Sequence, residues 1–329
     1  MTCNTICNPD LGDIIEKLNV GLEVSRSTKI FNPHYALYKN KANGIDIQKR
    51  REQFLINQKS KRKENLMKIR RLTSISIDDG DSLDGDNDRE NCGETSDESM
   101  DTTATKSVKS SHVKEEKFNM YKDQLMLSEW LTEKPFDFID NWFLVLCPIG
   151  KRCLVIASSG QTKAYSRTGH FISSFPSYLP GGNRRDNCAH RKSAILDCIY
   201  SELDKTYYIL DVMLWNQSHF YDSETDLRFY WLNCKIREEY SKVSTTDHLN
   251  PYKFILLDHY NCDNQSIIKA ITSYSLKPKI DGLLFFHKKS HYIPEVSPLV
   301  CWLKLNMIKD ILGIELDLTN QSMDVQIED

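Results

Sequence analysis

Five tryptophans are the side chains of this sequence with the clearest chemical potential, because an indole ring can stack on a nucleobase. Trp130 and Trp302 stand beside polar or basic residues, in the segments SEWL and LVCWLK. Trp142, Trp215 and Trp231 lie in apolar segments typical of a core. A base methylated at N7 is positively charged and gains a cation–π attraction to an indole. Trp130 and Trp302 are therefore candidates for a ligand platform, with core packing as the alternative.

Two other patterns suggest sites but are weaker. The segment LPGGNRR at 179–185 combines glycines, which let backbone amides approach an anion, with two arginines. It matches neither GxxxxGK[ST] nor GxGxxG, so a surface turn is the better interpretation. His287 and His291 have the i,i+4 spacing of a metal pair, but no third ligand is evident, which favours an ordinary loop.

Enzyme and membrane classes find little support in the sequence. HExxH, GxSxG and CxxC pairs with histidine partners do not occur, so we expect no catalytic residue, metal or cofactor. The ten cysteines are scattered, and the chain begins without a secretory pattern, which indicates reduced thiols in the cytosol or nucleus. No run approaches the roughly 18 apolar residues of a membrane span, so we expect no membrane partner.

The elements that must position the tryptophans follow residue 118. Helix or turn is expected at 118–131, and helices at 264–275 and 305–313. Turn clusters separate short apolar and β-branched runs that read as strands. These expected strands are 142–147, 152–157, 207–215, 228–234, 252–257, 282–287 and 299–304. The pattern predicts an α+β fold of curved antiparallel sheets with flanking helices.

Charge is strongly segregated in the N-terminal part. Twelve Lys and Arg face three acids between Lys39 and Arg71, whereas eleven acids face one base between Asp78 and Asp101. Residues 45–72 lack Gly and Pro and should form a helix without a continuous apolar stripe. Such a helix gains little from its own protein and should be stabilised by an acidic partner. The alternative is a solvated helix or a nonspecific RNA-binding arm.

Apolar residues spaced over 11–24 suggest a docking segment like a leucine-rich export signal, or else an element packed on the core. With the charge pattern, this divides the chain into five regions. They are a 1–38 N-terminal segment, a 39–72 basic helix, a 73–117 acidic disordered linker, a 118–315 folded domain and a 316–329 flexible tail.

Several stretches together resemble the snurportin family, adaptors that carry trimethylguanosine-capped small nuclear ribonucleoproteins (snRNPs) into the nucleus. The resemblance covers most of 119–304, and RRxxxLxxQKSKR at 50–62 with RRL at 70–72 resembles the family's importin-β-binding helix. The matching stretches are NxYKDQLMLSEWL (119–131), VLCPIGKRCLVIASSG (145–160), LPGGNRR (179–185), ILDCIY (195–200), TYYILDVMLW (206–215), FYD…TDLRFYW (220–231) and DGLLFFHKKSHY…PLVCWL (281–303). The resemblance implies a cap-binding domain built like the nucleotide-binding domain of mRNA capping enzymes and ligases.

The resemblance also implies roles for particular residues. Trp302 would stack on the methylated guanine, and Trp130 would lie against its dimethylated amino edge, with Ser128 as a hydrogen-bonding contact. A dimethylated nitrogen has no donor left, so an apolar ring costs little there. The remaining implied contacts are the phosphate-binding Lys151, Arg152 and Arg167 and the site-lining Cys147 and Cys153. The family commonly has lysine where this chain has Arg167.

For transport, the resemblance implies an importin-β partner and exportin-mediated recycling, in which 11–24 could take part. The protein would then shuttle between nucleus and cytoplasm. The implied importin-β contacts are Lys49, Arg50, Arg51, Lys59, Lys61, Arg62, Lys63, Arg70 and Arg71.

One pattern supports an enzymatic alternative. Residues 279–282 spell KIDG, and the KxDG lysine of capping enzymes and ligases forms a covalent nucleotide adduct. Here the pattern precedes an apolar strand near the C-terminal end, where those enzymes have a later acidic-Gly motif. A nucleotidyltransferase, and a nonspecific RNA-binding scaffold, remain as alternatives to a non-enzymatic adaptor.

Overall fold

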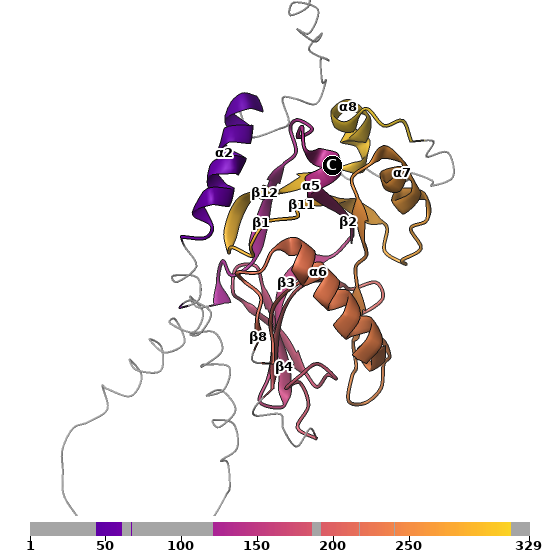
Figure 1. The fold of residues 1–329 in the computed structure, drawn as a ribbon. Helices are drawn as coiled ribbons and strands as arrows, with labels where there is room; N and C mark the ends of the chain where they lie inside the picture. The colour runs from indigo at the N-terminus through magenta and orange to yellow at the C-terminus, as the bar shows by residue number, and fades with distance from the viewer. Residues whose placement is uncertain are drawn as a thin grey trace, which may run out of the picture.

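Two sheets form the folded domain of the computed structural model, one above the other in Figure 1. The structure describes residues 44–60, 67, 121–185, 192–216, 218–239 and 241–316. The first sheet has five strands in the order β1 (Met126–Trp130), β12 (Glu295–Leu303), β11 (Ile280–His287), β2 (Trp142–Pro148) and β10 (His259–Asn261). All its pairs are antiparallel except β1 with β12.

The second sheet has seven strands and is again mainly antiparallel, with β9 parallel to β7. The order is β5 (Phe171–Phe175), β4 (Gln161–Ser166), β3 (Lys151–Ser158), β6 (Ser193–Ser201), β7 (Thr206–Trp215) and β8 (Ser218–His219), with β9 (Lys253–Leu256) on β7. The expected α+β class with antiparallel sheets is confirmed.

Strand β2 (Trp142–Pro148) shows why the strand segments of this chain are apolar without alternation. Phe143, Val145 and Cys147 face the core between the two sheets, whereas the alternate residues Leu144 and Leu146 face a second core. Helices α5 (Phe138–Asn141), α7 (Asn264–Thr272) and α8 (Ile308–Leu312) lie over that second core, as Figure 1 shows. Both faces of the strand are therefore buried, and its sequence shows no polar alternation.

Two expected elements differ from the observed ones. Residues 228–234 were predicted as a strand but belong to helix α6 (Thr225–Cys234), which continues as the π-helix η3 (Lys235–Glu239). The buried Phe229 and Leu232 are three residues apart, the spacing of one helical face, and Tyr230 between them is exposed. The end of the segment 118–131, expected as helix or turn, is strand β1.

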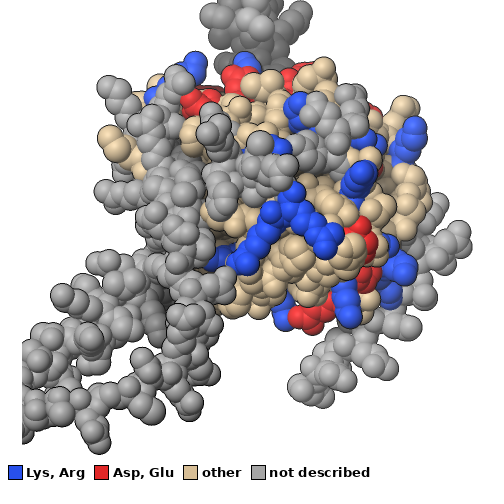
Figure 2. Space-filling model, turned by 90° about the horizontal axis from the view of Figure 1, so that it is seen from below, with Lys and Arg blue, Asp and Glu red and all other residues tan. Residues whose placement is uncertain are grey.

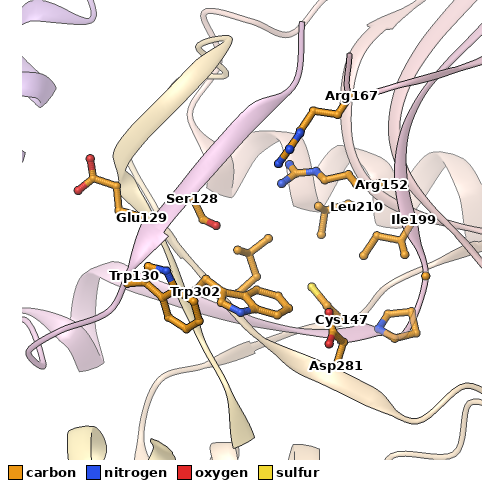
Figure 3. Close-up of a pocket in the computed structure, with 13 residues that line it drawn as sticks. Ser128, Glu129, Trp130, Cys147, Arg152, Arg167, Ile199, Leu210, Asp281 and Trp302 are labelled. Carbon is orange, nitrogen blue, oxygen red and sulfur yellow. The ribbon is translucent and has the colours of Figure 1, made fainter. Parts of the chain in front are cut away.

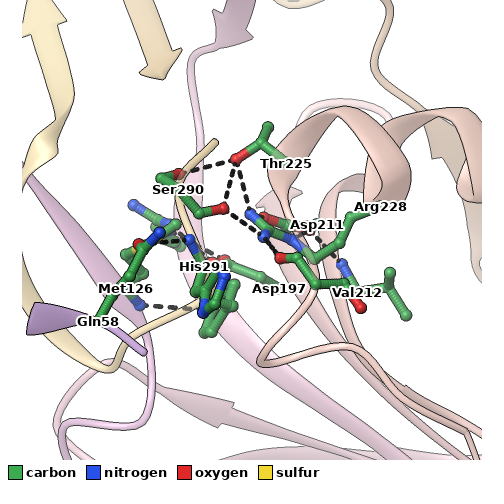
Figure 4. Close-up of polar contacts among 12 residues, drawn as sticks. Gln58, Met126, Asp197, Asp211, Val212, Thr225, Arg228, Ser290 and His291 are labelled. Carbon is green, nitrogen blue, oxygen red and sulfur yellow. Dashed lines mark hydrogen bonds and ion pairs between the residues drawn. The ribbon is translucent and has the colours of Figure 1, made fainter. Parts of the chain in front are cut away.

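Helix α6 is fixed to the second sheet by a buried ion pair. The Arg228 guanidinium donates to both carboxylate oxygens of Asp211 on β7, each at 2.9 Å, and neither side chain is exposed. Arg228 also donates to the carbonyl oxygen of Ser290, in the loop after β11 (Figure 4). This pair ties a helix, a strand of one sheet and a loop of the other together.

A further helix, α2 (Gly44–Asn57), lies beside β12 and β1 in Figure 1. The expectation that the basic helix gains little from its own protein is wrong for this part of it. Arg51 and Gln58 are buried, and Gln58 exchanges hydrogen bonds with the backbone of Lys289 and His291 (Figure 4). No helix in the described ranges is long and apolar enough to cross a membrane.

Candidate functional site

A cavity of about 340 Å³ opens between the two sheets, where β1, β2, β11 and β12 meet β3, β6 and β7. Figure 3 shows two chemically different ends: indole rings at one and guanidinium groups at the other. The lining residues are Ser128, Glu129, Trp130, Cys147, Pro148, Gly150, Arg152, Arg167, Ile199, Leu210, Asp281, Leu284 and Trp302.

The aromatic end contains both predicted tryptophans. Trp130 on β1 aligns with Trp302 on β12, after a register shift between Ser128 and Glu129. Both rings are partly buried and line the cavity, so neither is sealed in the core. Gly282 on β11 makes the position of Trp302 possible, because a Cβ at 282 would lie 2.4 Å from Cζ2 of that ring.

The cationic end contains Arg152, from β3, and Arg167, from the turn after β4 (Figure 3). Arg152 is oriented by the fully buried Asp197 on β6, through N–H···O distances of 2.9 and 2.7 Å. Tyr292 donates its hydroxyl to the same carboxylate, and that hydroxyl accepts the backbone N–H of Met126 at the start of β1. One buried carboxylate therefore links the guanidinium end to the strand that bears Ser128 and Trp130.

Cys147 lies on the cavity wall between the two ends. Its thiol is buried, and burial raises its pKa to about 12, with Arg152 acting in the opposite direction. The thiol is therefore neutral at physiological pH and contributes shape rather than charge or nucleophilicity.

Lys151 and Cys153, both predicted to belong to the site, do not line this cavity. Successive residues of a strand point to opposite faces, so Arg152 faces the cavity while its two neighbours face away. Cys153 is fully buried in the core on the far side of the second sheet. Lys151 is exposed and pairs with Glu202 at 2.7 Å. The structure thus brings together six of the eight predicted residues.

Two carboxylates of the cavity wall, Glu129 and Asp281, were not predicted. Glu129 pairs with Arg50 of α2. Asp281 precedes Gly282, and the acidic-Gly pair of the KIDG stretch was a signal that could have pointed to it.

The two weaker motifs lie elsewhere. The segment 179–185 is a turn packed against the β3–β4 hairpin, and Gly160 donates its N–H to the carbonyl of Gly181. Gly181 has φ +75° and no room for a Cβ, so packing explains this glycine. His287 ends β11, with Nε2 lying 3.4 Å from a carboxylate oxygen of Asp137, and His291 lies in the loop that follows. The described residues contain no cluster of three potential metal ligands.

The importin-β contacts expected in the arm are only partly described. Lys49 and Lys59 are exposed, Arg50 pairs with Glu129, and Arg51 is buried against the domain. The others lie outside the described residues: Lys61, Arg62, Lys63, Arg70 and Arg71. Residues 1–38, the linker 73–117 and the tail after residue 316 also lie outside them.

A comparison with protein families shows to which family the chain belongs. Residues 124–305 match the family described as "Snurportin1, m3G cap-binding domain". The chain belongs to the snurportin family. The matched range includes every residue that lines the cavity, so the cavity is part of a domain of the cap-binding type.

Solved structures with some similarity include a mycobacterial DNA ligase D complexed with ATP and MES, at 12% identity and a TM-score of 0.40. The ligase domain of M. tuberculosis LigD gives 12% identity and a TM-score of 0.37. These similarities cover 55% of the chain, and 60% and 58% of those two proteins.

Proposed function

We propose that the cavity binds the trimethylguanosine cap, with the base at the indole end and the bridging phosphates at the arginine end. The observation that carries this proposal is the alignment of Trp130 with Trp302 at one end of a cavity whose other end holds Arg152 and Arg167. Stacking on an indole stabilises a base by roughly 1–3 kcal/mol. Guanidinium groups are suited to phosphate oxygens because they donate in a planar fork.

Selectivity for the trimethylated base follows from the apolar character of the indole end. A guanine amino group placed against Trp130 would lose water as a hydrogen-bond acceptor, which costs roughly 1–3 kcal/mol. Two methyl groups on that nitrogen remove both donors, so the cost disappears. Ser128, beside Trp130 on β1, supplies a hydroxyl at the same wall.

A fluorescence titration with cap dinucleotides tests this proposal. Trimethylguanosine cap should bind more tightly than monomethyl cap, and monomethyl more tightly than unmethylated. Trp302→Ala should abolish the binding, whereas Tyr230→Ala, which removes an exposed aromatic ring outside the cavity, should leave it unchanged. Unchanged affinity in Trp302→Ala, with both variants folded, would remove the cap assignment.

For transport, we propose that the basic region 39–72 recruits importin-β and that 11–24 takes part in exportin-mediated recycling, so that the protein shuttles between cytoplasm and nucleus. Lys49 on α2 and Lys59 in the turn after it are exposed, whereas importin-β must displace the domain to reach Arg51. Deleting 39–72 should abolish capture by immobilised importin-β and leave cap affinity intact. Loss of both functions together would contradict a separate transport module.

We also propose that the protein is a non-enzymatic adaptor. Lys279 of the KIDG stretch is exposed and is not among the residues that line the cavity. Incubation with labelled GTP or ATP and magnesium should therefore give no covalent adduct. An adduct that disappears in Lys279→Ala would establish the nucleotidyltransferase alternative.

The remaining alternative, a nonspecific RNA-binding scaffold, requires a continuous basic surface. On the face seen in Figure 2, basic side chains lie among acidic and uncharged ones. Cap-independent RNA binding with a steep salt dependence would favour this alternative.

A further inference from the structure

The carboxylate of Asp281 stands at the indole end of the cavity because of an irregularity in β11. Ile280 aligns with Pro148 of β2 and Gly282 aligns with Cys147, so Asp281 is an extra residue between two aligned pairs. Such a bulge redirects a side chain that regular pairing would place differently. Asp281 lines the cavity beside Cys147 and Trp302 (Figure 3).

Asp281 differs from the other acids around the cavity in having no partner within the described part of the chain. Glu129 pairs with Arg50 of α2, and Asp197 binds Arg152 and Tyr292. Within the described residues, the Asp281 carboxylate makes no side-chain hydrogen bond or ion pair, and Asp281 is exposed. Burial is the main reason that the pKa of the Cys147 thiol is raised, and the negative charge of the nearby Asp281 carboxylate raises it further.

The trimethylated base has properties that fit a free carboxylate. Methylation at N7 gives the purine ring a positive charge, and dimethylation of N2 leaves N1–H as the donor on the Watson–Crick edge. A carboxylate can accept that N–H in a charge-assisted hydrogen bond and also balance the ring charge. The neutral Cys147 thiol next to it cannot supply either interaction.

We infer that Asp281 is a specificity-determining residue for the cationic base: its carboxylate recognises the positive charge of the N7-methylated ring and accepts N1–H. This inference rests on the proposed cap-binding function. It adds a second basis of selectivity, because Trp130 distinguishes the N2 substituents whereas Asp281 distinguishes the charge at N7.

The cavity has opposite charges at its two ends. Asp281 stands at the indole end and Arg152 and Arg167 at the other (Figure 3). A capped RNA has its positive charge on the base and its negative charge on the phosphates, so only one orientation matches both ends. The Asp197 carboxylate already balances Arg152, which limits the attraction of that arginine for Asp281.

Removing the charge from the ligand and from the side chain in turn tests the inference. Asp281→Asn has nearly the same shape but no charge, and it should be measured with two cap dinucleotides that both carry dimethylated N2, one with and one without the N7 methyl group. Affinity for the N7-methylated ligand should fall about tenfold, and affinity for the other by less than about twofold. Asp281→Glu should retain part of the preference for the N7 methyl group, because it keeps the charge.

The matched control is Glu133→Gln, which neutralises an exposed acid that does not line the cavity and should leave the N7 preference as in the wild type. Thermal melting verifies that all variants are folded. If Asp281→Asn lost affinity equally for both ligands, or lost none, the inference would be overturned. Tight cap binding by the wild type would uphold the cap proposal in either case. Absence of cap binding by the folded wild-type protein would overturn both.

Discussion

Arg50 of helix α2 pairs with Glu129, the residue between the cavity-lining Ser128 and Trp130 on β1. The Arg50 Nη1 to Glu129 Oε2 distance is 3.0 Å, and Nη2 donates to the other oxygen. The next residue, Arg51, donates to the carbonyl of Pro298 and to the sulfur of Cys301, directly before Trp302. Consecutive arginines of one helix therefore contact the two strands that carry the cavity tryptophans.

The two arginines should differ in their contribution to stability. Arg51 is buried and also lies over the Trp142 ring at 5.3 Å, so Arg51→Ala should lower the free energy of unfolding by about 1–3 kcal/mol. Arg50 is half exposed, so Arg50→Ala should cost only about 0.2–1 kcal/mol. Chemical denaturation measures both, with the exposed Lys49→Ala as control. Equal effects of the three variants would mean that α2 does not dock in solution.

Gly282→Ala should weaken cap binding at least about tenfold, because the new Cβ would lie 2.4 Å from the Trp302 ring and the ring must move. Fluorescence titration with trimethylguanosine cap dinucleotide measures the loss. Combining Gly282→Ala with Trp302→Phe places a smaller ring beside the new Cβ. This double variant should bind the cap better than Gly282→Ala alone. Unaltered affinity in Gly282→Ala would show that the ring position is not needed for binding.

Lys151 and Arg167 should behave differently in cap binding, although the family resemblance implies the same role for both. Arg167→Ala should weaken binding of the cap dinucleotide several-fold and reduce its salt dependence, because Arg167 lines the cavity. Lys151→Ala should change affinity by less than about twofold, since that ammonium pairs with Glu202 on the surface. Titrations at two salt concentrations compare the variants, and a larger loss in Lys151→Ala would contradict this placement of the phosphates.

The domain should lose stability on acidification through histidine burial. Desolvation is the main reason that the pKa of His259, His287 and His291 lies below the usual value of 6.5. The unfolded chain then binds more protons than the folded one below about pH 6.5, so stability falls as pH decreases through that range. The melting temperature should be lower at pH 5.5 than at pH 7.5.

A variant can isolate one of these histidines. His259 packs against Phe143 and Phe229 with ring-centroid distances of 4.9 and 5.2 Å, and His259→Phe keeps an aromatic ring there without a titrating group. Its melting temperature should vary less with pH than that of the wild type. A wild-type melting temperature that rises on acidification would contradict the sign of these shifts.

The sequence by itself determined the fold class and singled out the two indoles of the cavity as candidates. Short apolar and β-branched runs between turn clusters were sufficient for an α+β prediction, because strand formation depends on local composition. Trp130 and Trp302 could be separated from the buried Trp142 and Trp215 by their polar neighbours, since a residue near the surface has neighbours that remain hydrated.

Only the tertiary structure decided which residues reach the cavity. Where both faces of a strand are buried, polarity does not reveal its orientation, so Arg152 could not be distinguished from Lys151 and Cys153. Helix and strand are similarly ambiguous in a short apolar run such as 228–234, until packing selects the helix. The bulge that exposes Asp281 to the cavity and the burial of Arg51 depend on contacts with residues distant in the chain, which local sequence does not encode.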